Sequence, residues 1–141
     1  MMTTNSIILH LDIDLKLASV EVVNSKVTKF KILQEIWREG KVLNLSELLA
    51  DLWQKVAQEG HLDGVDKFIF LIGPNAGFTD SRVIYIWLKT EQMFKQTEFR
   101  VLKIGQLDIE SLDLSMIQDL IQQAIENGTQ ELQYISEPRI G

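Results

Sequence analysis

The chain has 141 residues and a mass of 16.2 kDa, the size of one ordinary domain that can build a hydrophobic core. Its 20 acidic and 14 basic residues give a formal net charge of −6, so stand-alone binding to a nucleic-acid backbone is not expected. It has no cysteine, which excludes disulfides, thiolate metal sites and cysteine catalysis. Because no signal peptide and no apolar stretch of about 18 residues is recognisable, we expect a soluble cytoplasmic protein without membrane contact.

The first part of the chain predicts three antiparallel strands. Three segments are rich in apolar and β-branched side chains and are separated by only a few polar residues. These segments are residues 7–11, 16–23 and 26–34. Because connections this short cannot cross over a sheet, neighbouring strands should run antiparallel.

A helix is predicted next, at residues 44–58. Asn44 or Ser46 is suited to be its N-cap, and Gly60 lies just beyond its end. One side of this helix is apolar and consists of Leu45, Leu48, Leu49, Leu52, Trp53 and Val56. Residues 67–72 follow as a short apolar run that is typical of a buried strand.

Residues 78–94 are ambiguous. Their centre is β-branched and aromatic, which favours a strand, whereas their length and polar flanks also allow a helix. The remaining elements are a strand, a helix and a final strand, at residues 98–104, 112–126 and 130–135. Ser111 or Asp113 is expected to cap the last helix. The order β-β-β-α-β-α-β-α-β predicts a single three-layer α/β domain over residues 1–141, with a mixed sheet.

Two stretches resemble a known family. Residues 11–20, with the sequence LDIDLKLASV, resemble the opening LDTSTEACSVAL of the bacterial TsaB family, also called YeaZ. Residues 72–82 are similar to its GPGSFTGLR motif with one extra residue. The matching motif residues are Gly73, Pro74, Phe78, Thr79 and Arg82, whereas Asn75, Ala76, Asp80 and Ser81 depart from the pattern. Residues 132–138 also resemble the PLYLREP ending of the family.

The resemblance implies a ribonuclease H-like fold of the actin-like ATPase (ASKHA) type, here without the family's second domain. TsaB is a non-catalytic partner of TsaD, the enzyme that transfers a threonylcarbamoyl group to the adenosine beside the tRNA anticodon. TsaE, a small ATPase, joins them. A TsaD-like partner, a TsaE-like ATPase and only indirect contact with tRNA are therefore implied. The family binds TsaD through its first helix and the helix after the motif, which implies that residues 78–94 are helical.

Two classes of catalytic site were considered for this fold. Asp12 and Asp14, two apart on a strand, would share one face and could begin a two-metal nuclease site. Glu47 and Asp51 could join from the first helix, but residues 67–72 contain no acid and leave the set incomplete. An ATPase needs glycine in the first hairpin, where the sequence has none.

No metal or cofactor is expected from the remaining motifs. His10 and His61 have no partner at the spacing of metal ligands, so we expect structural roles for both. Residues 73–77 precede a helix but lack the Gly-Lys pair of a phosphate-binding loop. We therefore predict no catalytic, cofactor-binding or metal-binding residue.

As a helix, residues 78–94 would carry an apolar arc of roughly 220°, whereas a stripe of roughly 100° covers one core. Either the first helix covers the second flank of this arc, or another protein does. The second reading predicts a partner interface that consists of Leu49, Leu52, Trp53, Val56, Val83, Ile86, Trp87 and Met93. Without a partner, the same surface should form a homodimer with Trp53 and Trp87 as the strongest anchors.

The sequence thus favours a non-catalytic interaction subunit of the tRNA threonylcarbamoyladenosine system. The alternatives are a small nucleotide-binding or nuclease-type enzyme on the same fold, and a self-associating paralogue with another partner. Missing phosphate-binding glycines and an incomplete set of acids favour the first hypothesis.

Overall fold

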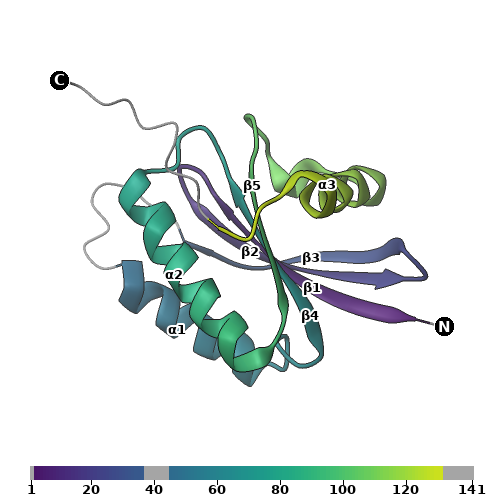
Figure 1. Ribbon diagram of the computed structural model, residues 1–141, viewed down its shortest axis with the longest axis horizontal. Coiled ribbons are helices and arrows are strands. Elements are labelled where there is room, and N and C mark those ends of the chain that lie inside the picture. The colour runs from purple at the N-terminus through teal and green to yellow at the C-terminus, as the bar shows by residue number, and fades with distance from the viewer. Residues whose placement is uncertain (1, 37–44, 132–141) are drawn as a thin grey trace.

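The computed structural model describes residues 2–36 and 45–131. It contains one mixed sheet with the strand order β3-β2-β1-β4-β5 (Figure 1). The strands are β1 (Thr3–Leu11), β2 (Leu15–Val23), β3 (Lys26–Ile36), β4 (Val65–Ile72) and β5 (Glu98–Lys103). β2 runs antiparallel to both of its neighbours, β1 and β3, whereas β4 pairs parallel with β1 and β5 pairs parallel with β4. The three strands predicted in the first part of the chain are confirmed.

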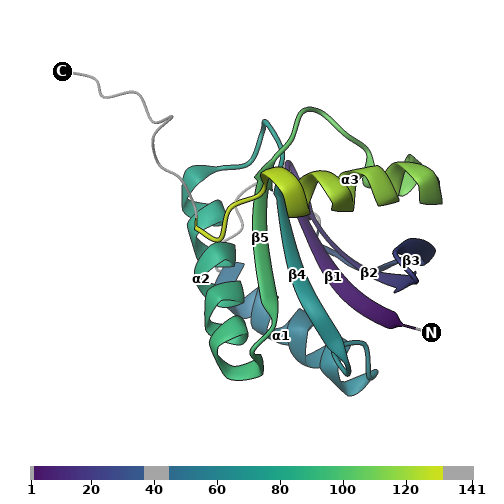
Figure 2. The same cartoon turned by 45° about the vertical axis from the view of Figure 1, so that its right-hand side comes forward.

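Helices cover both faces of this sheet. α1 (Leu45–Gln58) and α2 (Phe78–Lys95) lie on one face and α3 (Leu114–Asn127) lies on the other (Figure 2). Side chains alternate across β1, so that Ile7 and Leu9 pack under α1 and α2 whereas Ile8 packs under α3. The chain is therefore an α/β protein with three layers, as predicted.

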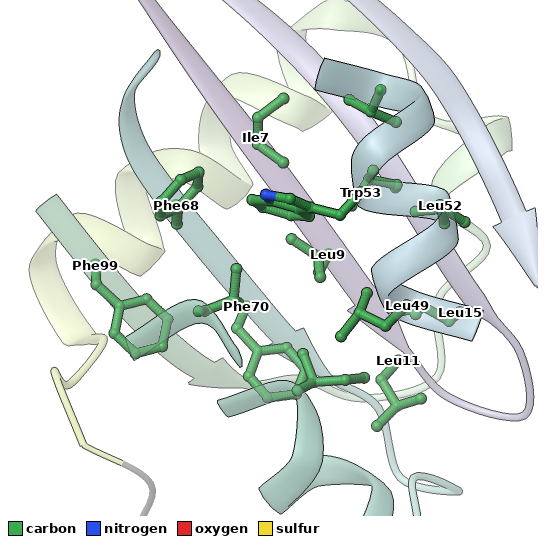
Figure 3. Close-up of a cluster of buried hydrophobic side chains, with 14 of the residues drawn as sticks. Ile7, Leu9, Leu11, Leu15, Leu49, Leu52, Trp53, Phe68, Phe70 and Phe99 are labelled. Atoms are coloured by element: carbon green, nitrogen blue, oxygen red, sulfur yellow. The ribbon is translucent and has the colours of Figure 1, made fainter. Parts of the chain in front are cut away.

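The larger core lies between the sheet and the first two helices. Figure 3 shows aliphatic side chains of β1 and aromatic side chains of β4 meeting the inner side of α1. Trp53 from α1 packs against Phe68 with ring centroids 5.6 Å apart. Burial of aromatic rings of this size is a dominant source of core stability.

Local sequence explains where the elements begin and end. Asn24 and Ser25 have φ values of 51° and 69°, the left-handed pair that a two-residue turn between antiparallel strands requires. Asp113 caps α3 by accepting a hydrogen bond from the Met116 N–H at 2.8 Å, as predicted. Ser46 lies inside α1 rather than at its N-cap, and the alternative cap Asn44 lies outside the described residues.

The ambiguous segment is a helix, α2. Its β-branched centre favoured a strand, but β4 and β5 are parallel neighbours and need a crossover connection between them. A helix provides that crossover and packs Ile84 and Leu88 back against the core. Tertiary topology therefore overrides local propensity at this place.

The end of the described chain differs from its prediction. Thr129 forms a single antiparallel bridge with Val101 of β5, while Gln130 and Glu131 belong to no strand. The rest of the predicted strand at residues 130–135, and the family-like ending at residues 132–138, lie outside the described residues. Within the described ranges, no helix is long and apolar enough to cross a membrane.

Candidate functional site

α2 turns a narrow side toward the sheet and leaves a broad apolar surface outside. Ser81, Ile84 and Leu88 are buried against the core. On the other side of the helix, Ile86, Met93 and Phe94 are 57%, 77% and 82% exposed. Together with the half-buried Val83 and Trp87, these three residues form what we call the α2 face. Exposed apolar side chains that gather on one side of a helix make this face a candidate interaction surface.

The α1 part of the predicted interface is corrected. Four of the predicted residues are buried in the chain's own core, because α1 packs this side against the sheet: Leu49, Leu52, Trp53 and Val56. Leu48, which was assigned to the same stripe, points outward instead and is 42% exposed. The predicted surface is therefore confined to α2, where Val83, Ile86, Trp87 and Met93 remain accessible in whole or in part.

α1 nevertheless covers one flank of α2, as the alternative reading anticipated. The Trp53 and Trp87 rings meet edge to face with centroids 6.3 Å apart. Beside this contact lies a shallow groove of about 290 Å³, which is lined by Ser46, Val83, Ile86, Trp87, Thr90 and Glu91. The indole N–H of Trp87 is buried and finds no hydrogen-bond acceptor within the described residues.

Thr90 occupies the centre of the α2 face without making it polar. Its hydroxyl donates to the Ile86 carbonyl of its own helix at 2.8 Å. A partner that covers Thr90 therefore leaves no unpaired hydroxyl behind, and the usual cost of burying a polar group does not arise. Thr90 also separates Ile86 from Phe94 by one helical turn on each side, so the two apolar side chains stand on one ridge.

The residues of the family-like motif surround the start of α2. Gly73 is buried directly after β4, and Pro74 is exposed in the turn that follows. Phe78 is the first residue of α2, and the Arg82 guanidinium lies 5.6 Å from the centroid of its ring. Thr79 is exposed in the first helical turn. The motif thus shapes the entry into α2.

Asp12, directly after β1, is hydrogen-bonded to the turn between β4 and α2. Its carboxylate is buried and accepts hydrogen bonds from the Asn75 N–H at 2.8 Å and from Gln106 Nε2 at 3.3 Å. A Cβ atom at Gly73 would lie only 2.7 Å from Asp12 Oδ1, so glycine is what allows the close approach. Sequence analysis missed this contact, although the glycine directly after a buried strand was a signal for it.

Asp12 and Asp14 do not share a strand face, contrary to the prediction. Both belong to the bend between β1 and β2, and the Asp12 N–H donates to the Asp14 carbonyl at 2.9 Å. Glu47 and Asp51 lie on the outer side of α1. Among the described residues, no group of three or more His, Asp or Glu side chains could hold a metal ion. The structure therefore does not bring the nuclease-type acids together.

Lys16, near the start of β2, is surrounded by acidic side chains. Its Nζ lies 3.8 Å from Asp14, 3.6 Å from Asp108 and 3.5 Å from Glu110. Burial alone would lower the pKa of Lys16, but these carboxylates outweigh it and raise the pKa. Burial also raises the pKa of Glu35, and a hydrogen bond with Asp14 adds to this shift.

The two histidines lie in different environments. His10 is buried on β1, and neither ring nitrogen has a hydrogen-bond partner among the described residues. Burial lowers the pKa of His10 below its ordinary value of 6.5, although nearby Asp12 opposes this shift. His61 lies 3.3 Å from Glu59 in the turn after α1. Among the described residues, neither histidine belongs to a group of three or more side chains that could hold a metal ion.

Comparison with known proteins adds no identification: no family model matches the chain, and no curated protein matches it either.

Proposed function

We propose that this chain is a non-catalytic interaction subunit that binds a partner protein through the α2 face. The observation that carries the proposal is the exposure of Ile86, Met93 and Phe94 side by side on a helix whose opposite side already fills the core. When a partner covers apolar side chains that were in contact with water, binding gains about 25 cal/mol of free energy per Å² of apolar surface buried. A monomer gains nothing from displaying three of them together.

The partner we propose is a TsaD-like enzyme of the tRNA threonylcarbamoyladenosine system, with a TsaE-like ATPase as a further component and tRNA contacted only indirectly. The resemblance to TsaB supports this choice, since that family binds TsaD through the helix after the GPGSFTGLR motif. The corresponding helix here is α2, which begins at Phe78. Such a partner would place the chain in the cytoplasm, and a homodimer through the same face is proposed for the isolated chain.

A ribonuclease H-like fold is part of the same proposal. Its support is the element order from β1 to α3, which runs β-β-β-α-β-α-β before the short η1 turn (Ile109–Ser111) and α3. The absence of catalysis is proposed because Asp12, the first acid that a nuclease of this fold would use, is engaged by Asn75 and Gln106 in holding a turn.

The test measures binding of a purified TsaD-like enzyme from the same organism to the wild type and to Ile86→Glu and Phe94→Glu. A charge inside an apolar contact removes a binding hot spot, so each variant should weaken binding by about 2 kcal/mol or more, roughly 30-fold. Met116→Glu is the matched control, because Met116 is 52% exposed on α3, across the sheet.

Failure of the wild type to bind would refute the TsaD-like partner. Equal loss in the Met116→Glu control would refute the α2 face as the contact. Nucleotide hydrolysis or nuclease turnover that disappears in Asp12→Asn would favour the enzyme alternative instead.

A further inference from the structure

α2 carries both an exposed aromatic ring and an apolar groove. The ring belongs to Phe94, which is 82% exposed near the end of the helix and so does not fill the groove of its own chain. The groove of about 290 Å³ includes Val83, Ile86, Trp87 and Thr90 in its lining. Because an apolar cavity of roughly 150 Å³ accepts benzene, this groove has room for a phenyl ring.

Thr90 lies between the Phe94 ring and the groove. Phe94 follows Thr90 by roughly 6 Å along the helix axis, whereas Trp87 precedes it by roughly 4.5 Å. At roughly 100° per residue, Phe94, Trp87 and Val83 fall on the same flank of a line drawn along α2 through Thr90. The ring and the groove therefore lie at similar distances on opposite sides of Thr90.

We propose that two copies of this chain pair antiparallel through α2 about a two-fold axis at Thr90, with Phe94 of each copy seated in the groove of the other. The inference rests on the proposed function and deepens it, because it states how the isolated chain covers the α2 face. A TsaD-like partner would use the same side chains, so this dimer and the complex with the partner exclude each other.

The two-fold arrangement serves both copies at once. A two-fold axis perpendicular to the helix reverses the second α2 and keeps each flank on its own side. Phe94 of one copy then lies between Val83 and Trp87 of the second copy, roughly 6 Å before the Thr90 of that copy. This contact fills two grooves and covers two rings, whereas a head-to-tail contact between two copies leaves one groove and one ring in water.

The polar groups beside this contact are already engaged within the chain. Glu91, which also lines the groove, pairs with Lys95 at 3.7 Å. Lys89 donates a hydrogen bond to the Gln130 carbonyl at 3.0 Å. The Thr90 hydroxyl donates to a carbonyl of its own helix. Covering this part of α2 therefore leaves these groups with their partners, which avoids the usual cost of burying polar atoms.

The chain has no cysteine, so disulfide trapping tests the arrangement directly. Packed helices lie roughly 8–10 Å apart, which brings two Cα atoms that face each other at the axis within reach of a disulfide. Under mild oxidation without a TsaD-like enzyme, Thr90→Cys should form a covalent dimer at least about tenfold faster than Met116→Cys, a control at an exposed position on α3. Adding Phe94→Ser to the Thr90→Cys protein should remove this difference.

Sedimentation of cysteine-free variants measures the same contact without a cross-link. Phe94→Ser should raise the dissociation constant of the dimer at least about 30-fold, whereas Met116→Ser should change it less than about threefold. Equal trapping of Thr90→Cys and Met116→Cys overturns the inference, as does trapping that survives Phe94→Ser or a wild type that stays monomeric at its highest soluble concentration. Successful trapping together with a TsaD-like enzyme that does not bind would refute the proposed partner and support the dimer.

Discussion

Replacing Gly73 by alanine tests the contact between the turn after β4 and Asp12. A Cβ atom at position 73 would lie 2.7 Å from Asp12 Oδ1 and 2.8 Å from its Cγ, well inside van der Waals contact. The glycine backbone is held because its N–H donates to the Leu11 carbonyl at 2.8 Å. The carboxylate is held by the Asn75 N–H. Neither the Gly73 backbone nor the Asp12 carboxylate can move away without weakening one of these hydrogen bonds.

We expect Gly73→Ala to lower the free energy of unfolding by about 2.5–4.5 kcal/mol. Overpacking a rigid site costs about 1–3 kcal/mol, and weakening a hydrogen bond to a charged acceptor adds about 1.5 kcal/mol. The assay is urea unfolding followed by circular dichroism. Gly105→Ala is the matched control, since a Cβ atom there meets no atom within 4 Å, and it should change stability by less than about 1 kcal/mol.

A double-mutant cycle identifies the cause of this loss. Asp12→Ala removes the two atoms that approach closest to position 73. In that background Gly73→Ala should cost less than about 1 kcal/mol, because contacting residues couple whereas distant ones add. The reasoning is refuted if Gly73→Ala costs the same in both backgrounds, or if it is no more harmful than Gly105→Ala.

Three further predictions concern other parts of the molecule. Burial lowers the pKa of His10 in the folded state, so the contribution of the neutral ring to stability is present above pH 6.5 and is lost as the pH falls below that value. The urea midpoint of His10→Leu should therefore depend less on pH between 5 and 7 than that of the wild type. Equal pH dependence of the two midpoints would contradict this prediction. Trp53→Ala should cost about 3–5 kcal/mol of stability, because Trp53 is buried between Phe68 and Trp87, and a loss below about 1 kcal/mol would show that it is not a core residue. Ile86→Glu should leave the unfolding free energy within about 0.5 kcal/mol of the wild type, whereas Ile84→Glu, at a fully buried position two residues earlier, should prevent folding. Similar thermal melting of the two variants would show that the buried and exposed sides of α2 are assigned wrongly.

The strands and the amphipathic helices were predictable because their patterns are local. Alternation of side chains and the Asn24-Ser25 turn define the β2–β3 hairpin within a few residues. The faces of α2 were harder, because every candidate residue on one broad arc was apolar. The arc placed Val83 and Trp87 in its middle, whereas the sheet buries Ile84 and Leu88 on one flank. Which flank is buried depends on the position of β5, which no local pattern contains.

The Asp12 contact was unpredictable for a related reason. It requires that β1 and β4 pair in parallel with Leu11 opposite Ile72, so that Asp12 and Gly73 follow side by side. Nothing in either segment alone specifies this register. The acid was weighed as a metal ligand because its partners, Asn75 and Gln106, lie more than 60 residues away in the chain.

The polar residues near the ends of β1 and β4 and the apolar α2 face support the same proposal. Asp12 and Lys16 lie near the ends of β1 and β4, where Asp12 is hydrogen-bonded by Asn75 and Gln106 and Lys16 is paired with Glu110. Polar groups that hold one another in place are poorly suited to bind and release a small substrate, because each release would leave a buried charge without its partner. The α2 face has the opposite property. Ile86, Met93 and Phe94 are exposed, and the Thr90 hydroxyl among them is already hydrogen-bonded, so covering this face costs little and removes exposed apolar area. This distribution of polar and apolar groups supports the proposal that the α2 face recognises another protein.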